Sequence, residues 1–255
     1  MKRNTLYSTQ LAKGTGMINE TLAILKVYTP GITREALCKF VIESNYLSTS
    51  TETRARDIVS RVFFNRFMLA NPSVPVWLKT IREKGLMVPQ MAQLFYIYCA
   101  RENAVLYDFV TQVMNPALDS ERSYFTRQEF TDFMHAIVVR GEASWTEAMQ
   151  KKNGGYVRST LIDFGFLDES NFVIPYDLDD FTVLYLMHEL HFEGLSDMAI
   201  WDHEDWQLFN LSRYDVLVRI MNLSLKGGFI AQTSGDIVSI SWRFNSMEEM
   251  IDATL

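Results

Sequence analysis

The sequence predicts a mostly α-helical protein that also contains small β-hairpins. Apolar residues recur at helical spacing through most of the 255 residues, as they do on the buried faces of amphipathic helices. Serine, threonine or aspartate residues suited to N-caps precede many of these segments. Strand-like runs are short, and the clearest two, FIAQT and IVSISWRF, flank the turn Ser234-Gly235-Asp236. We therefore expect a helical N-terminal domain with a helix-turn-helix-like unit and a helical C-terminal domain with winged-helix-like β-hairpins.

The composition is that of a globular chain, with 48% hydrophobic and 22% charged residues. Cys38 and Cys99 lie in apolar helical segments without the spacing of a metal site, which favours a reducing compartment. The N-terminus MKRNTLYSTQ lacks the apolar core of a signal peptide. The near-apolar run Met91–Ala100 is about half of a ~20-residue membrane span. We therefore expect a cytoplasmic protein with no membrane partner.

Charge divides the chain into two unlike halves. The net charge is −7, but residues 1–118 carry 14 basic and 8 acidic residues, whereas residues 119–255 carry 10 and 23. Asn115-Pro116 marks the change. We predict a basic all-helical domain at residues 1–116 and an acidic helical domain with winged-helix-like hairpins at residues 117–255. The basic half can attract phosphates, while the acidic half is repelled by them or faces a basic protein.

The segment from residue 33 to residue 68 has the pattern of helix, turn, helix. Thr33 can cap the first helix, and Thr49 with Glu52 resembles a capping box for the second. At 100° per residue, Arg54, Arg61 and Asn65 fall within about 40° of one another on the second helix. Such a basic stripe is how many proteins enter a DNA groove, although a merely solvated helix face explains the same pattern.

Basic residues elsewhere extend this hypothesis. The candidate DNA-binding residues are Arg54, Arg56, Arg61, Asn65, Arg66, Lys79, Lys151, Lys152 and Arg158. Gly14-Thr15-Gly16 is expected to be a flexible lead-in, since no Lys-Ser/Thr follows at the spacing of a phosphate loop.

Further helix starts are predicted beyond the boundary. They lie at Thr126 with Glu129, at Ser144 with Glu147, at Asp179, near Leu195, at Ser212 with Asp215, and near Ser246. The second of these helices is expected to end at Lys151-Lys152, because cations suit a helix C-terminus, and Gly154-Gly155 then opens a new compact unit. That unit contains a short predicted strand at residues 172–174, so one or two wings are expected.

Catalytic patterns are scarce. The sequence has no GxSxG elbow, no Walker loop and no dinucleotide fingerprint. His188 and His191 are one helical turn apart and could bind one metal ion, but HELH is not the HExxH spacing of a zinc protease. We therefore expect no enzymatic activity, no metal and no cofactor, and keep a metal-dependent nuclease as a minor alternative.

The chain resembles a known family along its length. The segments concerned are GTGMINETLAIL behind Tyr7, TETRARDIVSRVFFNRF, RSTLIDFGFLDE, WQLFNLSRYDVLVRIMNL and the ending SMEEMIDATL. They resemble the BrxA family, the small component of BREX bacteriophage-exclusion systems. The resemblance implies a cytoplasmic, non-enzymatic protein of a multi-gene defence system, with an all-α or winged-helix fold and DNA binding. The family has also been likened to the RNA-binding antitermination factor NusB.

These observations predict an accessory protein that binds duplex DNA mainly through phosphates. Two alternatives stay open. The acidic half could make the protein a scaffold that docks another protein of the defence system, or the chain could bind RNA as NusB does.

Overall fold

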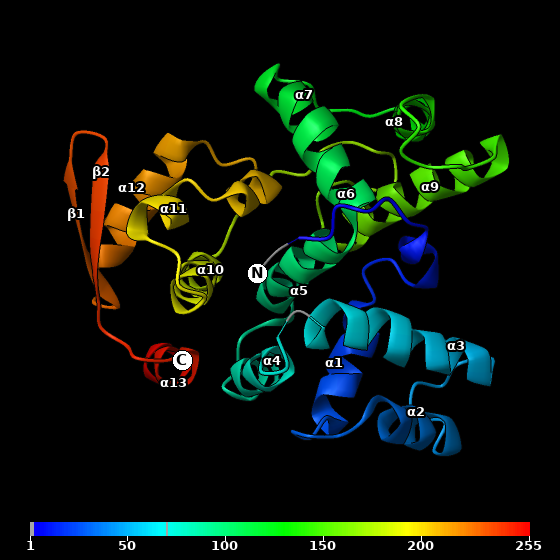
Figure 1. The fold of residues 1–255 in the computed structure, drawn as a ribbon, viewed down its shortest axis with the longest axis horizontal. Coiled ribbons are helices and arrows are strands. Elements are labelled where there is room, and N and C mark those ends of the chain that lie inside the picture. The colour runs from blue at the N-terminus through cyan, green and yellow to red at the C-terminus, as the bar shows by residue number, and fades with distance from the viewer. Residues whose placement is uncertain (1–2, 70) are drawn as a thin grey trace. The chain divides into compact units, whose positions relative to one another are not determined.

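The computed structural model describes residues 3–69 and 71–255, which are mostly helical and include one antiparallel hairpin (Figure 1). The first helices are a 3₁₀ turn at Gln10–Lys13, α1 (Ile18–Val27), α2 (Arg34–Glu43), α3 (Glu52–Asp57) with a π-helical continuation over Ile58–Met68, α4 (Val74–Glu83) and α5 (Val88–Glu102). Next come α6 (Ala104–Phe109), a π-helical segment at Val110–Met114, α7 (Asn115–Asp119), α8 (Arg127–Val139) and α9 (Glu147–Asp163). The last elements are α10 (Asp180–Phe192), α11 (Asp197–Trp201), a 3₁₀ helix at Glu204–Phe209, α12 (Arg213–Ser224), β1 (Phe229–Ser234), β2 (Ile237–Trp242) and α13 (Met247–Thr254). The predicted fold class, mostly α with a small hairpin, is confirmed.

Contacts divide the chain into two compact units. One, here called the helix-turn-helix unit, contains Lys2–Lys79 and Phe95–Tyr176, and the other, the hairpin unit, contains Thr80–Leu94 and Asp177–Leu255. These units differ from the division at residues 116 and 117 that the charge profile suggests. Asn115 and Pro116 lie inside an unbroken helical run from α6 to α7, with Pro116 in the first turn of α7, where a proline is tolerated.

The helix-turn-helix unit contains the predicted pair of helices, α2 followed by α3, which pack against each other (Figure 1). Thr33 caps α2 as expected, and its side chain accepts a hydrogen bond from the Ala36 amide. The second helix begins two residues later than predicted, because Thr51 rather than Thr49 is its N-cap and accepts from the Arg54 amide.

Aromatic side chains fill the core of this unit. Phe67, on the π-helical continuation of α3, contacts Phe63, Phe95 and Tyr98, with ring centroids 5.5–5.7 Å apart. All four rings are buried. The aromatic residues that crowd the arginine-rich helix are therefore core residues, so much of that helix faces protein rather than solvent.

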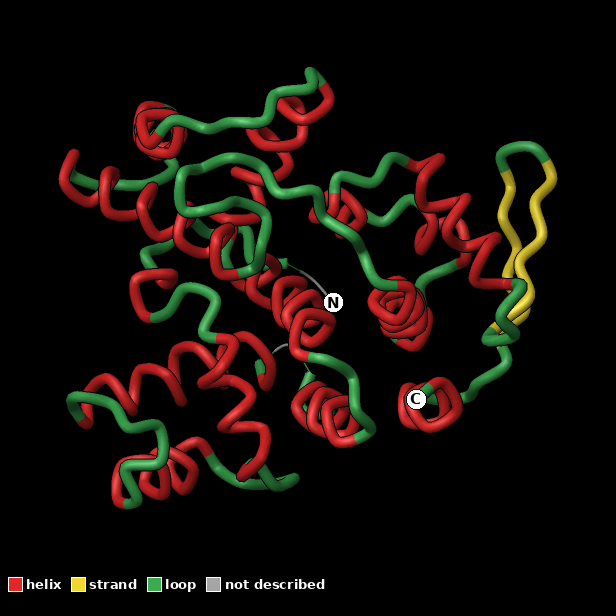
Figure 2. Tube along the Cα trace, turned by 180° about the vertical axis from the view of Figure 1, so that it is seen from behind, coloured by secondary structure: helices red, strands yellow, loops and turns green. Residues whose placement is uncertain are grey.

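The hairpin unit is organised around α10, which is buried from Phe181 to Leu190. Helices α11, α12 and α13 each contact α10. Strand β1 pairs with β2 in antiparallel register, from Phe229 opposite Trp242 to Ser234 opposite Ile237 (Figures 1 and 2). The predicted turn at Ser234-Gly235-Asp236 is confirmed. The expected second hairpin is not formed in the described residues, because residues 172–174 make only isolated bridges to Tyr124 and Leu167.

The helix α9 overturns one expectation from the sequence. It does not end at Lys151-Lys152 but runs unbroken through Gly154 and Gly155 to Asp163. Its N-cap is Thr146, not Ser144. The consequence is that both lysines and both glycines lie on one helix, in its middle.

Among residues 3–69 and 71–255, no helix combines the length and the apolar composition that crossing a membrane requires.

Candidate nucleic-acid interface

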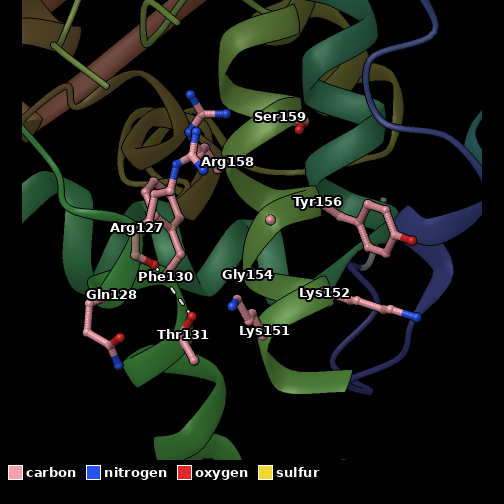
Figure 3. A pocket seen from close by; sticks show the side chains of 11 residues that line it. Arg127, Gln128, Phe130, Thr131, Lys151, Lys152, Gly154, Tyr156, Arg158 and Ser159 are labelled. Atoms are coloured by element: carbon pink, nitrogen blue, oxygen red, sulfur yellow. Dashed lines mark hydrogen bonds between the residues drawn. The ribbon is translucent and has the colours of Figure 1, made fainter. Parts of the chain in front are cut away.

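An open cavity of about 680 Å³ lies between α8 and α9 in the helix-turn-helix unit (Figure 3). It is called the α8–α9 groove below. Its lining residues are Arg127, Gln128, Phe130 and Thr131 from α8, and Lys151, Lys152, Gly154, Gly155, Tyr156, Arg158 and Ser159 from α9. Three of the residues predicted to bind DNA, Lys151, Lys152 and Arg158, are thus brought together.

Local sequence signals place the two helices. Helix α8 begins with the predicted capping box, in which Thr126 accepts from the Glu129 amide and the Glu129 carboxylate accepts from the Thr126 amide. Helix α9 packs directly on α8, because Gly154 has no side chain to separate its backbone from that of Phe130. The close contact puts the cations of α9 on the same cavity as Arg127 at the start of α8.

Among residues 3–69 and 71–255, four cations and no carboxylate line the groove. Its charged residues are Arg127, Lys151, Lys152 and Arg158. The side chains of Arg127, Lys151 and Lys152 are exposed, and within the described residues they donate to no hydrogen bond or ion pair. Like charges that are not neutralised within the protein attract an anion to the cavity that they share.

Arg158 is held in place by its own unit. Its Nε donates to Asn171 Oδ1, and its Nη2 donates to the Glu169 carbonyl oxygen at 2.5 Å. Asn171 is itself buried. The guanidinium is therefore oriented before any ligand arrives, which lowers the entropic cost of contacting an anion.

Two other predicted contact residues, Arg66 and Lys79, make structural hydrogen bonds. Arg66 is 4% exposed, and its guanidinium donates to the carbonyl oxygens of Gly14, Thr15 and Gly16 at 2.6–3.1 Å. The prediction that Arg66 contacts DNA is therefore wrong, because its donors are engaged inside the protein, and the segment from Gly14 to Gly16 is fixed rather than a flexible lead-in. Lys79 donates to the carbonyl oxygens of Lys26 and Tyr28, at the C-terminal end of α1.

The predicted basic stripe is only partly exposed. Arg54 is half-buried and donates to the Lys13 carbonyl oxygen, and Asn65 is also half-buried. Arg56 and Arg61 are exposed. Arg56 lines a second cavity, of about 440 Å³, whose other charged residues are Arg34, Glu35, Lys39 and Glu43. The stripe therefore offers one exposed arginine, Arg61, and Arg56 lies beside it in a cavity of mixed charge.

The histidine pair has a structural role. His188 is fully buried, its Nδ1 lies 2.8 Å from the Leu184 carbonyl oxygen, and its ring meets Trp242 edge-on. Burial lowers the pKa of His188 to about 4. The ring of His191 stacks on Trp242 at a centroid distance of 4.0 Å. In the part of the chain that the structure describes, no group of three or more His, Cys, Asp or Glu side chains is placed to hold a metal ion.

Arg127 is the groove residue that sequence reasoning missed. It directly follows the N-cap Thr126, and at that position it resembles any exposed first-turn residue. The useful signal is Gly154 in α9, because a glycine inside a helix can indicate that another backbone approaches closely, as that of Phe130 does here.

One comparison with known proteins gives the family, and another gives a similar fold. A family model described as BrxA matches residues 5–189. The crystal structure of an uncharacterized protein from Magnetospirillum magneticum is similar in fold, with a TM-score of 0.60 and 15% identity, over 79% of this chain and 96% of that chain. No curated protein matches the chain.

Proposed function

The chain belongs to the BrxA family and is thus a component of a BREX phage-exclusion system, and we propose that it acts there as a non-enzymatic protein that binds duplex DNA. The α8–α9 groove is the proposed site of contact. Binding is mainly electrostatic, through the phosphates, with modest preference for sequence.

The observation that supports this proposal is the charge of the groove. Four cations line it without a carboxylate, and Arg127, Lys151 and Lys152 have no partner among the described residues. A duplex presents one phosphate charge per ~1.7 Å of its axis, so neighbouring cations can each neutralise a phosphate and release a counterion.

The test is a mobility-shift titration of a 30-base-pair duplex at several salt concentrations. The variant Lys151→Ala/Lys152→Ala removes two cations from the groove. Its matched control, Lys26→Ala/Lys39→Ala, removes two exposed lysines of the same unit that do not line the groove. If both groove lysines contact phosphates, the slope of log K against log salt falls by about 1.8, since each contact contributes about 0.9.

The control variant should keep the slope of the wild type. Equal slopes for the two variants would remove the groove as the site of binding. An excess of structured RNA, added as competitor at fixed salt, separates the two nucleic acids: efficient displacement of the duplex would favour the RNA-binding alternative.

A further inference from the structure

Gly155 lies at the centre of the basic face of α9. Its neighbours on the helix surface are the residues three and four positions away, which are Lys151, Lys152, Arg158 and Ser159. All four line the α8–α9 groove together with Gly155. Three cations and a hydroxyl therefore surround a patch of helix that carries no side chain.

Nothing in the fold requires a glycine at position 155. Its backbone is helical and not left-handed, and a Cβ atom added there would meet no atom of the described residues within 4 Å. The adjacent Gly154 differs, since a Cβ there would lie 2.9 Å from the backbone of Phe130. Because glycine weakens a helix interior relative to alanine, Gly155 carries a cost that packing does not explain.

A helix backbone without a side chain allows a ligand to approach closely. The hydrogen-bond donors around it determine which kind of ligand can bind. The ammonium groups of Lys151 and Lys152 are free, and the Nη1 group of Arg158 donates to no described atom. The Ser159 hydroxyl can donate as well. Several hydrogen-bond donors, most of them positively charged, surround one small open position. Such a position suits a phosphate group, whose oxygens accept several hydrogen bonds at once.

We propose that the backbone surface at Gly155 is the binding position for one internal phosphodiester of a nucleic-acid strand that runs along the groove. This inference rests on the proposed function. It adds a position at which the strand touches the helix itself. A side chain at residue 155 would stand where the phosphate lies and would hold the strand away from the four surrounding donors.

The test uses the full chain with Gly155→Ala and Gly155→Leu. The matched control is Ala148→Leu, which places the same side chain about 20° away on the same face of α9, two turns earlier and outside the groove. We expect Gly155→Ala to unfold at higher urea concentration than the wild type. We expect Gly155→Leu to bind the duplex about tenfold more weakly, with a lower salt slope, and Ala148→Leu to bind within about twofold of the wild type.

The outcomes separate the inference from the function that it rests on. Wild-type affinity in Gly155→Leu, with weakened binding in Lys151→Ala/Lys152→Ala, overturns the position at Gly155 and leaves the proposed function standing. Wild-type affinity in both variants overturns the groove as the site of DNA contact and the inference with it, and failure of the wild-type protein to bind the duplex overturns the proposed function. A loss of stability in Gly155→Ala overturns the inference, because it requires open space at that residue. Duplexes with 5′-hydroxyl and 5′-phosphate ends test the ligand. If binding requires the 5′-phosphate, the group bound at Gly155 is the end of a strand and not an internal phosphodiester.

Discussion

Gly154 lies so close to Phe130 that a Cβ atom on the glycine would be 2.9 Å from both the carbonyl carbon and the carbonyl oxygen of Phe130. Real Cβ atoms do not approach backbone atoms this closely, so α8 and α9 meet at a distance that only glycine permits. The contact matters for function because α9 carries Lys151 and Lys152 and α8 carries Arg127. The groove exists as one cavity because these two helices touch.

The first prediction concerns the two glycines of α9. Gly154→Ala should lower the free energy of unfolding by about 1–2 kcal/mol, because the cost of overpacking against backbone exceeds the helix-propensity gain of about 1 kcal/mol. Gly155→Ala should raise it by up to about 1 kcal/mol, since the new methyl group meets open space. Urea unfolding followed by circular dichroism measures both, and a rise in the free energy of unfolding for Gly154→Ala would show that α8 does not constrain Gly154.

The second prediction concerns Arg66. Its three hydrogen bonds fix the segment from Gly14 to Gly16, and Gly16 is held a second time by donation from its amide to Asp163 Oδ2 at 2.7 Å. Arg66→Ala should therefore lower the free energy of unfolding by about 3 kcal/mol, because buried carbonyl groups lose charged donors. Arg61→Ala, at an exposed arginine of the same helical run, should change it by less than about 0.5 kcal/mol. Similar losses in the two variants would contradict the structural role of Arg66.

Local signals explain what the sequence could predict. The caps at Thr33, Thr126, Asp179, Ser212 and Ser246 were found because a cap bonds to an amide two or three residues away. The hairpin was found for a similar reason, since its turn and both strands are contiguous in the chain.

Two misses are local, since the N-caps of α3 and α9 are Thr51 and Thr146, each two residues beyond the predicted cap. The others depend on contacts between distant segments. Gly154-Gly155 has the composition of a helix end, and only the presence of Phe130 on a neighbouring helix explains a glycine in mid-helix. In the sequence, Arg66 resembles a surface arginine. Only the fold brings the carbonyl oxygens of residues 14–16 within hydrogen-bond distance of its guanidinium. Lys151, Lys152 and Arg158 were candidates from charge alone, and the structure added what charge could not give, a shared cavity.

The third prediction is a pH dependence from His188. Burial lowers its pKa from 6.5 to about 4, so the folded protein holds the ring neutral while the unfolded chain takes up a proton below pH 6.5. Its contribution to stability is complete above pH 6.5 and is lost as the pH falls towards 4, by roughly 3 kcal/mol in total. The charge of the nearby His191 also lowers the pKa of His188.

His188→Leu isolates this effect. Leucine fits the surrounding apolar rings and cannot titrate, so the variant should lose less unfolding free energy than the wild type between pH 7 and pH 4. Urea unfolding at several pH values measures the difference. Parallel pH profiles for the two proteins would mean that His188 titrates normally in the folded state.

The last prediction compares the two basic surfaces of the helix-turn-helix unit. Arg56→Ala/Arg61→Ala removes two exposed arginines of the helix-turn-helix segment, the same charge change as Lys151→Ala/Lys152→Ala in the groove. The cavity of Arg56 is lined by three cations and two carboxylates, Glu35 and Glu43, which offset most of its positive charge, whereas no carboxylate of the described residues lines the groove. We therefore expect the arginine variant to lower the salt slope of duplex binding by less than about 0.9, and the lysine variant by about 1.8. Mobility shifts of both variants against one duplex provide the comparison. A larger loss in the arginine variant would move the site of DNA contact from the α8–α9 groove to the second helix of the helix-turn-helix segment.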